Sequence, residues 1–159
     1  MADIKEPFRI VLFEPQIPQN TGNIARLCAC TDCELYLVGQ LGFRITDKYV
    51  KRAGLDYWED VKIEQYQTLD ELEHKFPDKK FYYISTKAKK LYTEEKFKPG
   101  CFLVFGSETR GLPKELIENN FDKSLKIPMK EGQRSLNLSN SVAIVLYEAI
   151  RQTGFLISD

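Results

Sequence analysis

A short segment that mixes glycine with a hydroxyl, an acid and a base follows an apolar run at residues 103–113, LVFGSETRGLP. Gly106 and Gly111 are five residues apart, and their small size lets the backbone turn and present its N–H groups to a ligand. The segment is not a phosphate-binding P-loop, because no Lys-Ser/Thr pair follows the second glycine, and it is not the dinucleotide signature GxGxxG. It therefore predicts a functional loop that binds a ligand in another way.

A second candidate segment, 15–26, reads PQIPQNTGNIAR. Its prolines stop the preceding strand, Asn20, Thr21 and Asn23 are residue types that cap helices, and the first turn of a helix attracts anions. Arg26 follows Asn20 by six residues. Two interpretations stay open. The helix start and Arg26 belong to a functional site, or the segment is an ordinary capped helix whose arginine lies in solvent or in an ion pair.

A third segment, 127–149, reads IPMKEGQRSLNLSNSVAIVLYEA and crowds serine and asparagine at the entrance of a strongly apolar helix. These crowded residues are Ser135, Asn137, Ser139, Asn140 and Ser141. One such residue is enough to cap a helix. Some of the five are therefore expected to bind a ligand or to satisfy backbone groups in a crowded loop.

Several familiar catalytic and metal-binding sets are missing from the sequence. The single histidine, His74, falls in a predicted surface helix, so neither an acyl-transfer triad nor a histidine-rich metal site is expected. Cys28, Cys30 and Cys33 would point in divergent directions on a helix, which is poor spacing for zinc. Together with Cys101 they predict buried, reduced thiols, and no metal is expected.

Strand-like and helix-like segments alternate along the chain, which predicts an α/β domain with a mostly parallel sheet and flanking helices. Ligands of such folds bind beyond the carboxyl ends of the strands, where the three segments and the residues after Ile84 would meet. The expected strands are 8–13, 34–39, 61–66, 80–86, 101–106 and 124–128. The expected helices are 20–33, 68–76, 112–120, a helix from 138 that ends at Gly154, and a short one over 47–53.

Size and charge restrict the class of protein further. At 159 residues and 18.4 kDa, a single domain over 1–159 is expected, and no apolar run or signal peptide points to a membrane or to export, so a cytoplasmic location is expected. Lys+Arg and Asp+Glu are both 23, which excludes a strongly basic scaffold. The charge is uneven, however: residues 79–98 hold seven lysines against two glutamates, and residues 44–52 hold four basic residues against one acid. Such local excess suits a face presented to RNA.

Taken in order and spacing, NTGNIAR, FGSETRGLP and RSLNLSNSVAIVLYEA resemble the SPOUT superfamily of S-adenosylmethionine-dependent RNA methyltransferases. The resemblance runs from Phe8 to about Gly154 and is to the ribose 2′-O-methylating branch, in particular to small single-domain enzymes acting on the wobble nucleotide, cytidine or modified uridine, of leucine tRNAs. It implies a C-terminal trefoil knot, formed by the three motif loops, whose interior holds S-adenosylmethionine without a metal.

The resemblance also implies roles for individual residues. The cofactor-binding set would be Ile84, Ser85, Gly106, Ile127 and Ser135. The catalytic set would be Arg26, Asn20, Glu108, Ser135 and Asn137. Arg26 corresponds to the family's catalytic arginine, either as the group that deprotonates the ribose hydroxyl or as the anchor of a phosphate, and Glu108 would fix Arg26 or a hydroxyl partner.

The expected function is therefore 2′-O-methylation of the wobble ribose, with the anticodon arm of tRNA as substrate. The alternatives are an RNA-binding domain without catalysis and a methyltransferase acting at another RNA position. A homodimer is implied by the family, and Ile144, Leu146, Tyr147 and Ile150 of the last helix widen its apolar stripe beyond what one buried face needs.

Overall fold

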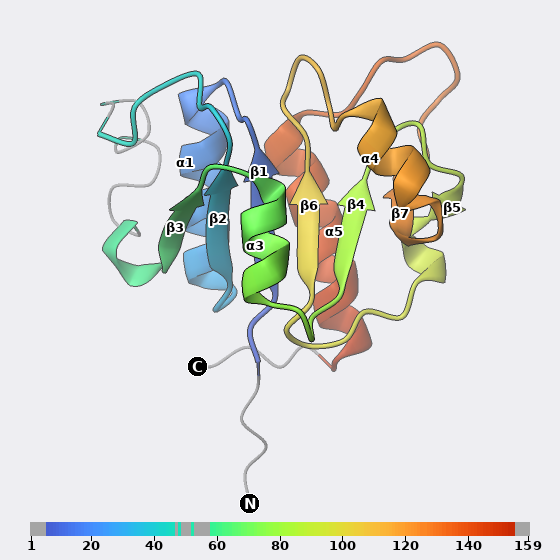
Figure 1. Cartoon of the computed structure of the whole chain (residues 1–159), viewed down its shortest axis with the longest axis horizontal. Helices are drawn as coiled ribbons and strands as arrows, with labels where there is room; N and C mark the ends of the chain where they lie inside the picture. The colour runs from blue at the N-terminus through green and yellow to red at the C-terminus, as the bar shows by residue number, and fades with distance from the viewer. Residues whose placement is uncertain (1–5, 47, 49–51, 53–57, 155–159) are drawn as a thin grey trace, which may run out of the picture.

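A parallel sheet forms the centre of the structure, a computed structural model that describes residues 6–46, 48, 52 and 58–154. Within these residues it has seven strands in the order β3–β2–β1–β6–β4–β7–β5 (Figure 1). The strands are β1 (Arg9–Phe13), β2 (Glu34–Val38), β3 (Ile63–Tyr66), β4 (Phe81–Ile84), β5 (Lys90–Leu91), β6 (Phe102–Phe105) and β7 (Ser124–Lys126). Every pair is parallel, so the predicted α/β class is confirmed.

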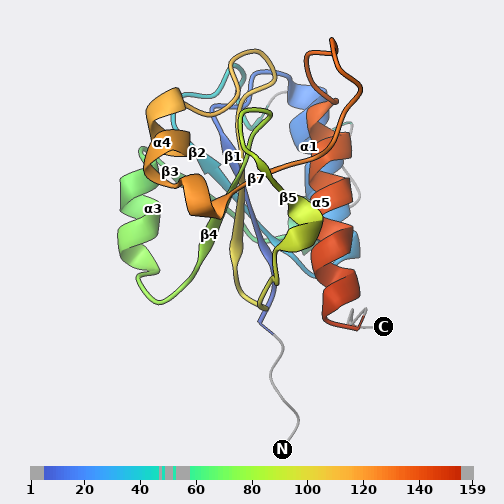
Figure 2. The same ribbon diagram turned by 90° about the vertical axis from the view of Figure 1, so that its right-hand side faces the viewer.

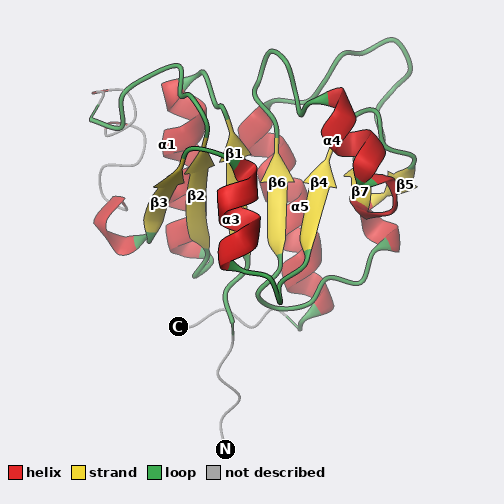
Figure 3. Ribbon diagram, in the orientation of Figure 1, coloured by secondary structure: helices red, strands yellow, loops and turns green. Residues whose placement is uncertain are grey.

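Helices cover both faces of the sheet (Figures 2 and 3). Helices α1 (Pro18–Cys30) and α5 (Leu138–Gln152) lie on one face, and α3 (Leu69–Lys75) and α4 (Lys114–Asn119) lie on the other. Single-turn helices η1 (Trp58–Asp60), η2 (Tyr92–Glu94) and η3 (Phe121–Lys123) complete the described elements. Among the described residues, none of the helices has the length and apolar character that a membrane crossing requires.

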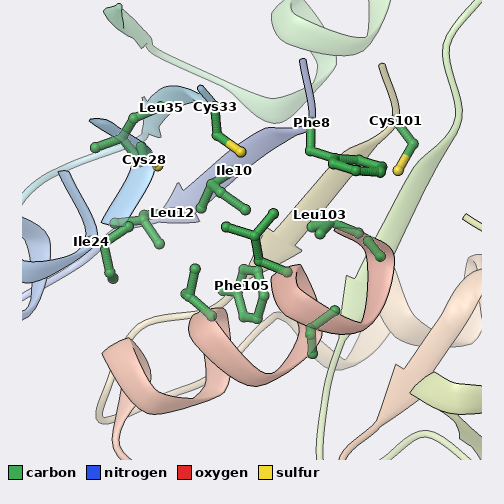
Figure 4. Packing of buried hydrophobic residues seen from close by; sticks show 14 of the residues in the cluster. Phe8, Ile10, Leu12, Ile24, Cys28, Cys33, Leu35, Cys101, Leu103 and Phe105 are labelled. Atoms are coloured by element: carbon green, nitrogen blue, oxygen red, sulfur yellow. The ribbon is translucent and has the colours of Figure 1, made fainter. Parts of the chain in front are cut away.

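Successive strand residues feed two separate apolar cores, because neighbouring side chains of a strand point to opposite faces of the sheet. In β6, Leu103 and Phe105 join the core beneath α1 and α5, whereas Phe102 and Val104 join the core beneath α3 and α4. Figure 4 shows the first of these cores, with Leu103 and Phe105 beside the last helix. Burial on both faces explains why the central strands read as continuous apolar runs.

Some element boundaries differ from the expectation. Helix α1 begins at Pro18 rather than at residue 20, and its N-cap is Ile17, which supplies no side-chain hydrogen bond. The prediction that Asn20, Thr21 or Asn23 caps this helix is therefore wrong, because all three lie inside it. Strand β5 was not expected, and the helix proposed over 47–53 falls largely outside the described residues. The trefoil knot stays a prediction.

The cysteines are all free, and three of the four are buried. Burial raises the pKa of the Cys28 thiol well above its usual value and raises the pKa of Cys101 to about 12. Cys33 is also buried, and the Thr31 hydroxyl donates a hydrogen bond to its sulfur. Cys30, at the end of α1, is exposed, which corrects the expectation that all four thiols are buried.

Thiol labelling tests this arrangement. A reactive thiol must be accessible and ionised, so a maleimide or disulfide reagent at neutral pH should modify Cys30 rapidly and the other three only after unfolding. Mass spectrometry of the native protein should give a single fast adduct, and Cys30→Ser should abolish it. Fast labelling of Cys28 or Cys101 in the folded protein would contradict the packing described above.

Candidate functional site

A cavity of about 740 Å³ opens beyond the carboxyl ends of β4, β6 and β7. This volume falls in the range of small-molecule sites. Eight of the nine residues singled out from the sequence line it: Asn20, Ile84, Ser85, Gly106, Glu108, Ile127, Ser135 and Asn137. The segments that are far apart in the chain thus meet at one place, as expected for strand ends in a parallel sheet.

The wall between β6 and α4 is a tightly closed loop over 106–113. The Gly111 N–H donates to the Ser107 carbonyl at 2.9 Å, and the Arg110 N–H donates to the Ser107 hydroxyl at 3.0 Å. A Cβ on Gly106 would come within 2.1 Å of the Gly111 carbonyl carbon and 2.3 Å of the Leu112 nitrogen. Gly106 is therefore required by the closure of its own loop, whatever it contributes to a ligand.

The Glu108 carboxylate ties this loop to the segment after β1. Its oxygens accept the backbone N–H groups of Gln16 at 2.9 Å and Ile17 at 2.8 Å, and the Asn20 side-chain amide at 3.1 Å. Glu108 thus supplies the acceptor that the start of α1 lacks locally, and its negative charge lies where the positive end of a helix dipole favours it. The acid that the resemblance places among the catalytic residues has a clear structural task.

A further bond connects the third segment to this cluster. The Asn137 side-chain N–H donates to the Asn20 side-chain oxygen at 3.2 Å. The Asn137 oxygen caps α5 by accepting the N–H groups of Ser139 at 2.9 Å and Asn140 at 3.3 Å. Glu108, Asn20 and Asn137 therefore form a continuous hydrogen-bonded chain, called here the carboxylate–amide relay, that joins all three segments.

Ser135 lines the cavity together with the relay residues, and it is exposed. Apolar side chains face the same space, among them Ile84, Phe105 and Ile127. The cavity thus offers hydroxyl and backbone groups beside apolar walls, a combination that suits a ligand with polar and apolar parts. Among the described residues no group of His, Cys, Asp and Glu could hold a metal ion.

Arg26 is the one singled-out residue that does not line the cavity. It is exposed on α1, six residues beyond Asn20. Six residues turn a helix by about 240° beyond one full turn and advance it by about 9 Å, so the two side chains leave the helix on different sides. A single chain therefore does not bring Arg26 to the cavity.

Three cations that the sequence analysis left without a role at the site line the cavity: Lys87, Arg110 and Arg134. All three are exposed. The signal that could have found them is a basic residue close to a strand end or a glycine: Lys87 follows the strand expected over 80–86, Arg110 precedes Gly111, and Arg134 is two residues after Gly132. The basic stretch 79–98, by contrast, is not one patch. Lys87 lies at the cavity, whereas Lys79 pairs with Glu6 and Lys80 precedes β4 at the opposite end of the sheet.

The sequence pattern of the SpoU rRNA methylase family matches residues 7–147. The chain belongs to this family. A Saccharophagus degradans protein named tRNA (cytidine(34)-2'-O)-methyltransferase is 48% identical over 149 residues, which are 93% of this chain and 97% of that one. A Geobacillus stearothermophilus protein, to which the same name has been assigned provisionally, is 51% identical over 149 residues, which are 92% of this chain and 95% of that one.

Solved structures of the family share the fold. A structure described as giving insights into the 2-OH methylation of C/U34 on tRNA matches with a TM-score of 0.89 and 38% identity, over 94% of this chain and 98% of that one. An AdoMet-bound rRNA methyltransferase from Sinorhizobium meliloti matches with a TM-score of 0.83 at 21% identity, over 99% of this chain and 60% of that one. The chain therefore has the fold of the SpoU methylases.

Glu108→Gln tests the carboxylate–amide relay. The variant removes the charge and leaves one acceptor oxygen for three donors, so we expect a loss of about 1–2 kcal/mol in the free energy of unfolding, measured by denaturant or thermal melts. Glu131→Gln, on the exposed loop before α5, is the matched control and should be neutral. A variant that keeps wild-type stability but loses activity would assign Glu108 to the chemistry alone.

Proposed function

We propose that the protein transfers a methyl group from S-adenosylmethionine to the ribose 2′-hydroxyl of the wobble nucleotide, position 34, of tRNA. The observation that carries this proposal is the convergence of the three family segments around one cavity through the carboxylate–amide relay. The names of relatives that are about half identical over nearly the whole chain support position 34 and tRNA as the substrate.

The residues of the cavity fit the proposed cofactor. Ile84 and Ile127 offer apolar contacts for the adenine, Ser85 and the 106–113 loop offer backbone and hydroxyl groups, and Ser135 lies where the methionine part and the ribose would meet. An AdoMet-bound structure of the same fold supports this assignment. When bound, the sulfonium supplies an already activated methyl group, so the protein mainly has to position the acceptor and exclude water.

The acceptor is a weak nucleophile, so a protein group must orient the 2′-hydroxyl, whose proton would pass to solvent water as its oxygen bonds the methyl carbon and the carbon–sulfur bond breaks. We assign the orienting role to Arg26, acting through a phosphate of the RNA, because a guanidinium with a pKa above about 12 is a poor base. Ser135 and the Asn137 amide are the polar groups near the reacting ribose. The relay holds Asn137 so that its side chain keeps one orientation.

Because Arg26 lies outside the cavity of its own chain, we infer a homodimer in which each cavity receives Arg26 from the partner chain. Exposed apolar side chains on the α1 and α5 side of the sheet support such an interface. They are Ile17, Leu136, Ile144 and Tyr147. An obligate interface of roughly 2,000 Å² or more is expected.

The finer substrate range follows from the resemblance. We propose leucine tRNAs with cytidine or modified uridine at position 34 as substrates, in the cytoplasm, and the description of one similar structure names both C and U at that position. The anticodon arm would be the part of the tRNA that is bound, because unstacked loop bases are what single-strand RNA readers recognise.

Mapping the methylated nucleotide tests the proposal. Purified protein, S-adenosylmethionine and tRNA transcripts that differ in the anticodon loop should give one 2′-O-methyl group at position 34, detected by mass spectrometry of nuclease fragments. Methylation of a base, or of another position, would support the alternative of a different methyltransferase. Binding of tRNA without any transfer would support the non-catalytic alternative.

Arg26→Ala should keep cofactor affinity within about twofold and lose transfer by at least about a hundredfold, and Arg26→Lys should recover little, because an ammonium lacks the planar fork of a guanidinium. Lys75→Ala, at the far end of α3, is the control and should transfer normally. Mixing inactive Arg26→Ala with inactive Ser135→Tyr should restore activity if each site uses both chains. Full activity of Arg26→Ala would return this arginine to an ordinary surface role.

Salt dependence tests the contribution of Lys87 to RNA binding. If Lys87 holds a phosphate, Lys87→Ala should reduce the log–log salt slope of tRNA binding by about 0.7–0.9 without changing the methylated position. Lys98→Ala removes an exposed charge from the same basic stretch at the amino end of β6 and should leave the slope unchanged. Equal effects of the two substitutions would indicate a diffuse field rather than a contact at the cavity.

A further inference from the structure

A second hollow, of about 570 Å³, adjoins the cavity and has no part in the proposed methyl transfer. It lies beyond the carboxyl ends of β1 and β2, on the other side of the 106–113 loop, and residues 107 and 109–112 line both spaces. Gln16, Gln40 and Lys114 line this second hollow and not the cavity. A ligand that occupies both spaces has to cross this loop.

The side chains around the second hollow suit a nucleotide. Lys87, Arg110 and Lys114 are cationic, and among the residues that the structure describes Glu14 is the one acidic side chain that lines it. The Lys114 ammonium is 3.7 Å from Glu118 on an exposed part of α4, a pair too exposed to compete strongly with a phosphate. The Gln40 side-chain amide presents a donor and an acceptor of the kind that read base edges, and so does the Gln16 amide, whose nitrogen also donates to the Glu14 carbonyl at 2.9 Å.

The backbone around the second hollow is tightly packed. Glu14 has a φ of 50°, in the left-handed region that non-glycine residues rarely adopt, and its carboxylate accepts the Gln40 N–H at 3.2 Å. A Cβ on Gly39 would lie 2.7 Å from the Glu14 Cγ, and one on Gly42 would lie 2.8 Å from the Gln16 Cα. Gln16 and Gln40 are therefore presented from a fixed frame, which lowers the cost of ordering them around a ligand.

We propose that this second hollow receives one base of the substrate RNA with its phosphate, next to the ribose that is methylated in the cavity. The inference rests on the proposed function, since it places a second part of the same RNA. The exposed apolar side chains Ile144 and Tyr147 that favour a partner chain belong to α5, whereas Gln40 and Lys114 of the second hollow lie after β2 and at the start of α4.

The test uses variants whose side chains line only the second hollow. Gln40→Ala and Lys114→Gln should each weaken the binding of an anticodon stem-loop RNA by about tenfold, while the affinity for S-adenosylmethionine changes by less than about twofold. Gln65→Ala on the edge strand β3 and Lys75→Gln are the matched controls. Thermal melts confirm that all four variants fold. Binding by Gln40→Ala and Lys114→Gln that equals that of the controls overturns the inference.

Stem-loops with an abasic residue at position 33, 34 or 35 identify the base. If the second hollow holds one of these bases, the corresponding abasic RNA binds wild type weakly and Gln40→Ala weakens it no further, whereas the other RNAs show the full effect. Equal losses on every RNA overturn the inference. Transfer of methyl to full-length tRNA is measured in parallel. Wild-type protein that fails to methylate position 34 overturns the proposed function and this inference with it, whereas normal transfer with control-like variants overturns this inference alone.

Discussion

A single carboxylate connects parts of the chain that lie about ninety residues apart and thereby determines where the site forms. Glu108 accepts two backbone N–H groups that precede or begin α1 and the amide of Asn20, and Asn20 in turn accepts from Asn137 at the start of α5. Charge-assisted bonds to a carboxylate are stronger than neutral ones, and here they also compensate the helix start, whose own cap residue is an isoleucine without an acceptor. The remaining polar groups of the site are positioned relative to this relay.

The 106–113 loop is the second constraint, because it forms a wall of the cavity and a wall of the second hollow. The closed loop leaves no space for a Cβ at Gly106, so a glycine is required there for the loop to close, whether or not a ligand binds. This changes how substitutions there are interpreted: a larger residue at 106 would displace the 111–112 backbone, and a loss of cofactor binding would follow from that displacement as much as from a blocked contact. In the proposed complex, the methyl donor would lie on one side of this loop and one base of the RNA on the other.

Much of the fold was predictable from the sequence, because the periodicity of burial is local. The strands at 8–13 and 101–106 and the helix from Leu138 are apolar runs and stripes, and strand–helix alternation implied the parallel sheet. The site was predictable as a set of segments, and eight of its nine candidate residues meet. Long-range contacts could not be predicted from local sequence patterns. The acceptor for the backbone N–H groups at the start of α1 is Glu108, and the asparagines that fit a capping pattern lie inside the helix. Residue spacing in the sequence does not show how the chain runs in three dimensions. It therefore could not predict that Arg26 lies outside the cavity, or that the lysines of 79–98 are divided between the two ends of the sheet.

The sequence separation of the relay has a consequence for how the site comes into being. The Asn20–Asn137 bond closes 117 residues and the bonds of Glu108 close 88 to 92. Contacts of such long range form only after much of the intervening chain is ordered, because the entropy of closing the loop has to be met first. On the ribosome, which delivers the chain from its N-terminus, residues 20 and 108 emerge well before Asn137 and the helix that it caps. A competent site is therefore a late product of folding, and partly synthesised chains carry the first two segments without a pocket to occupy.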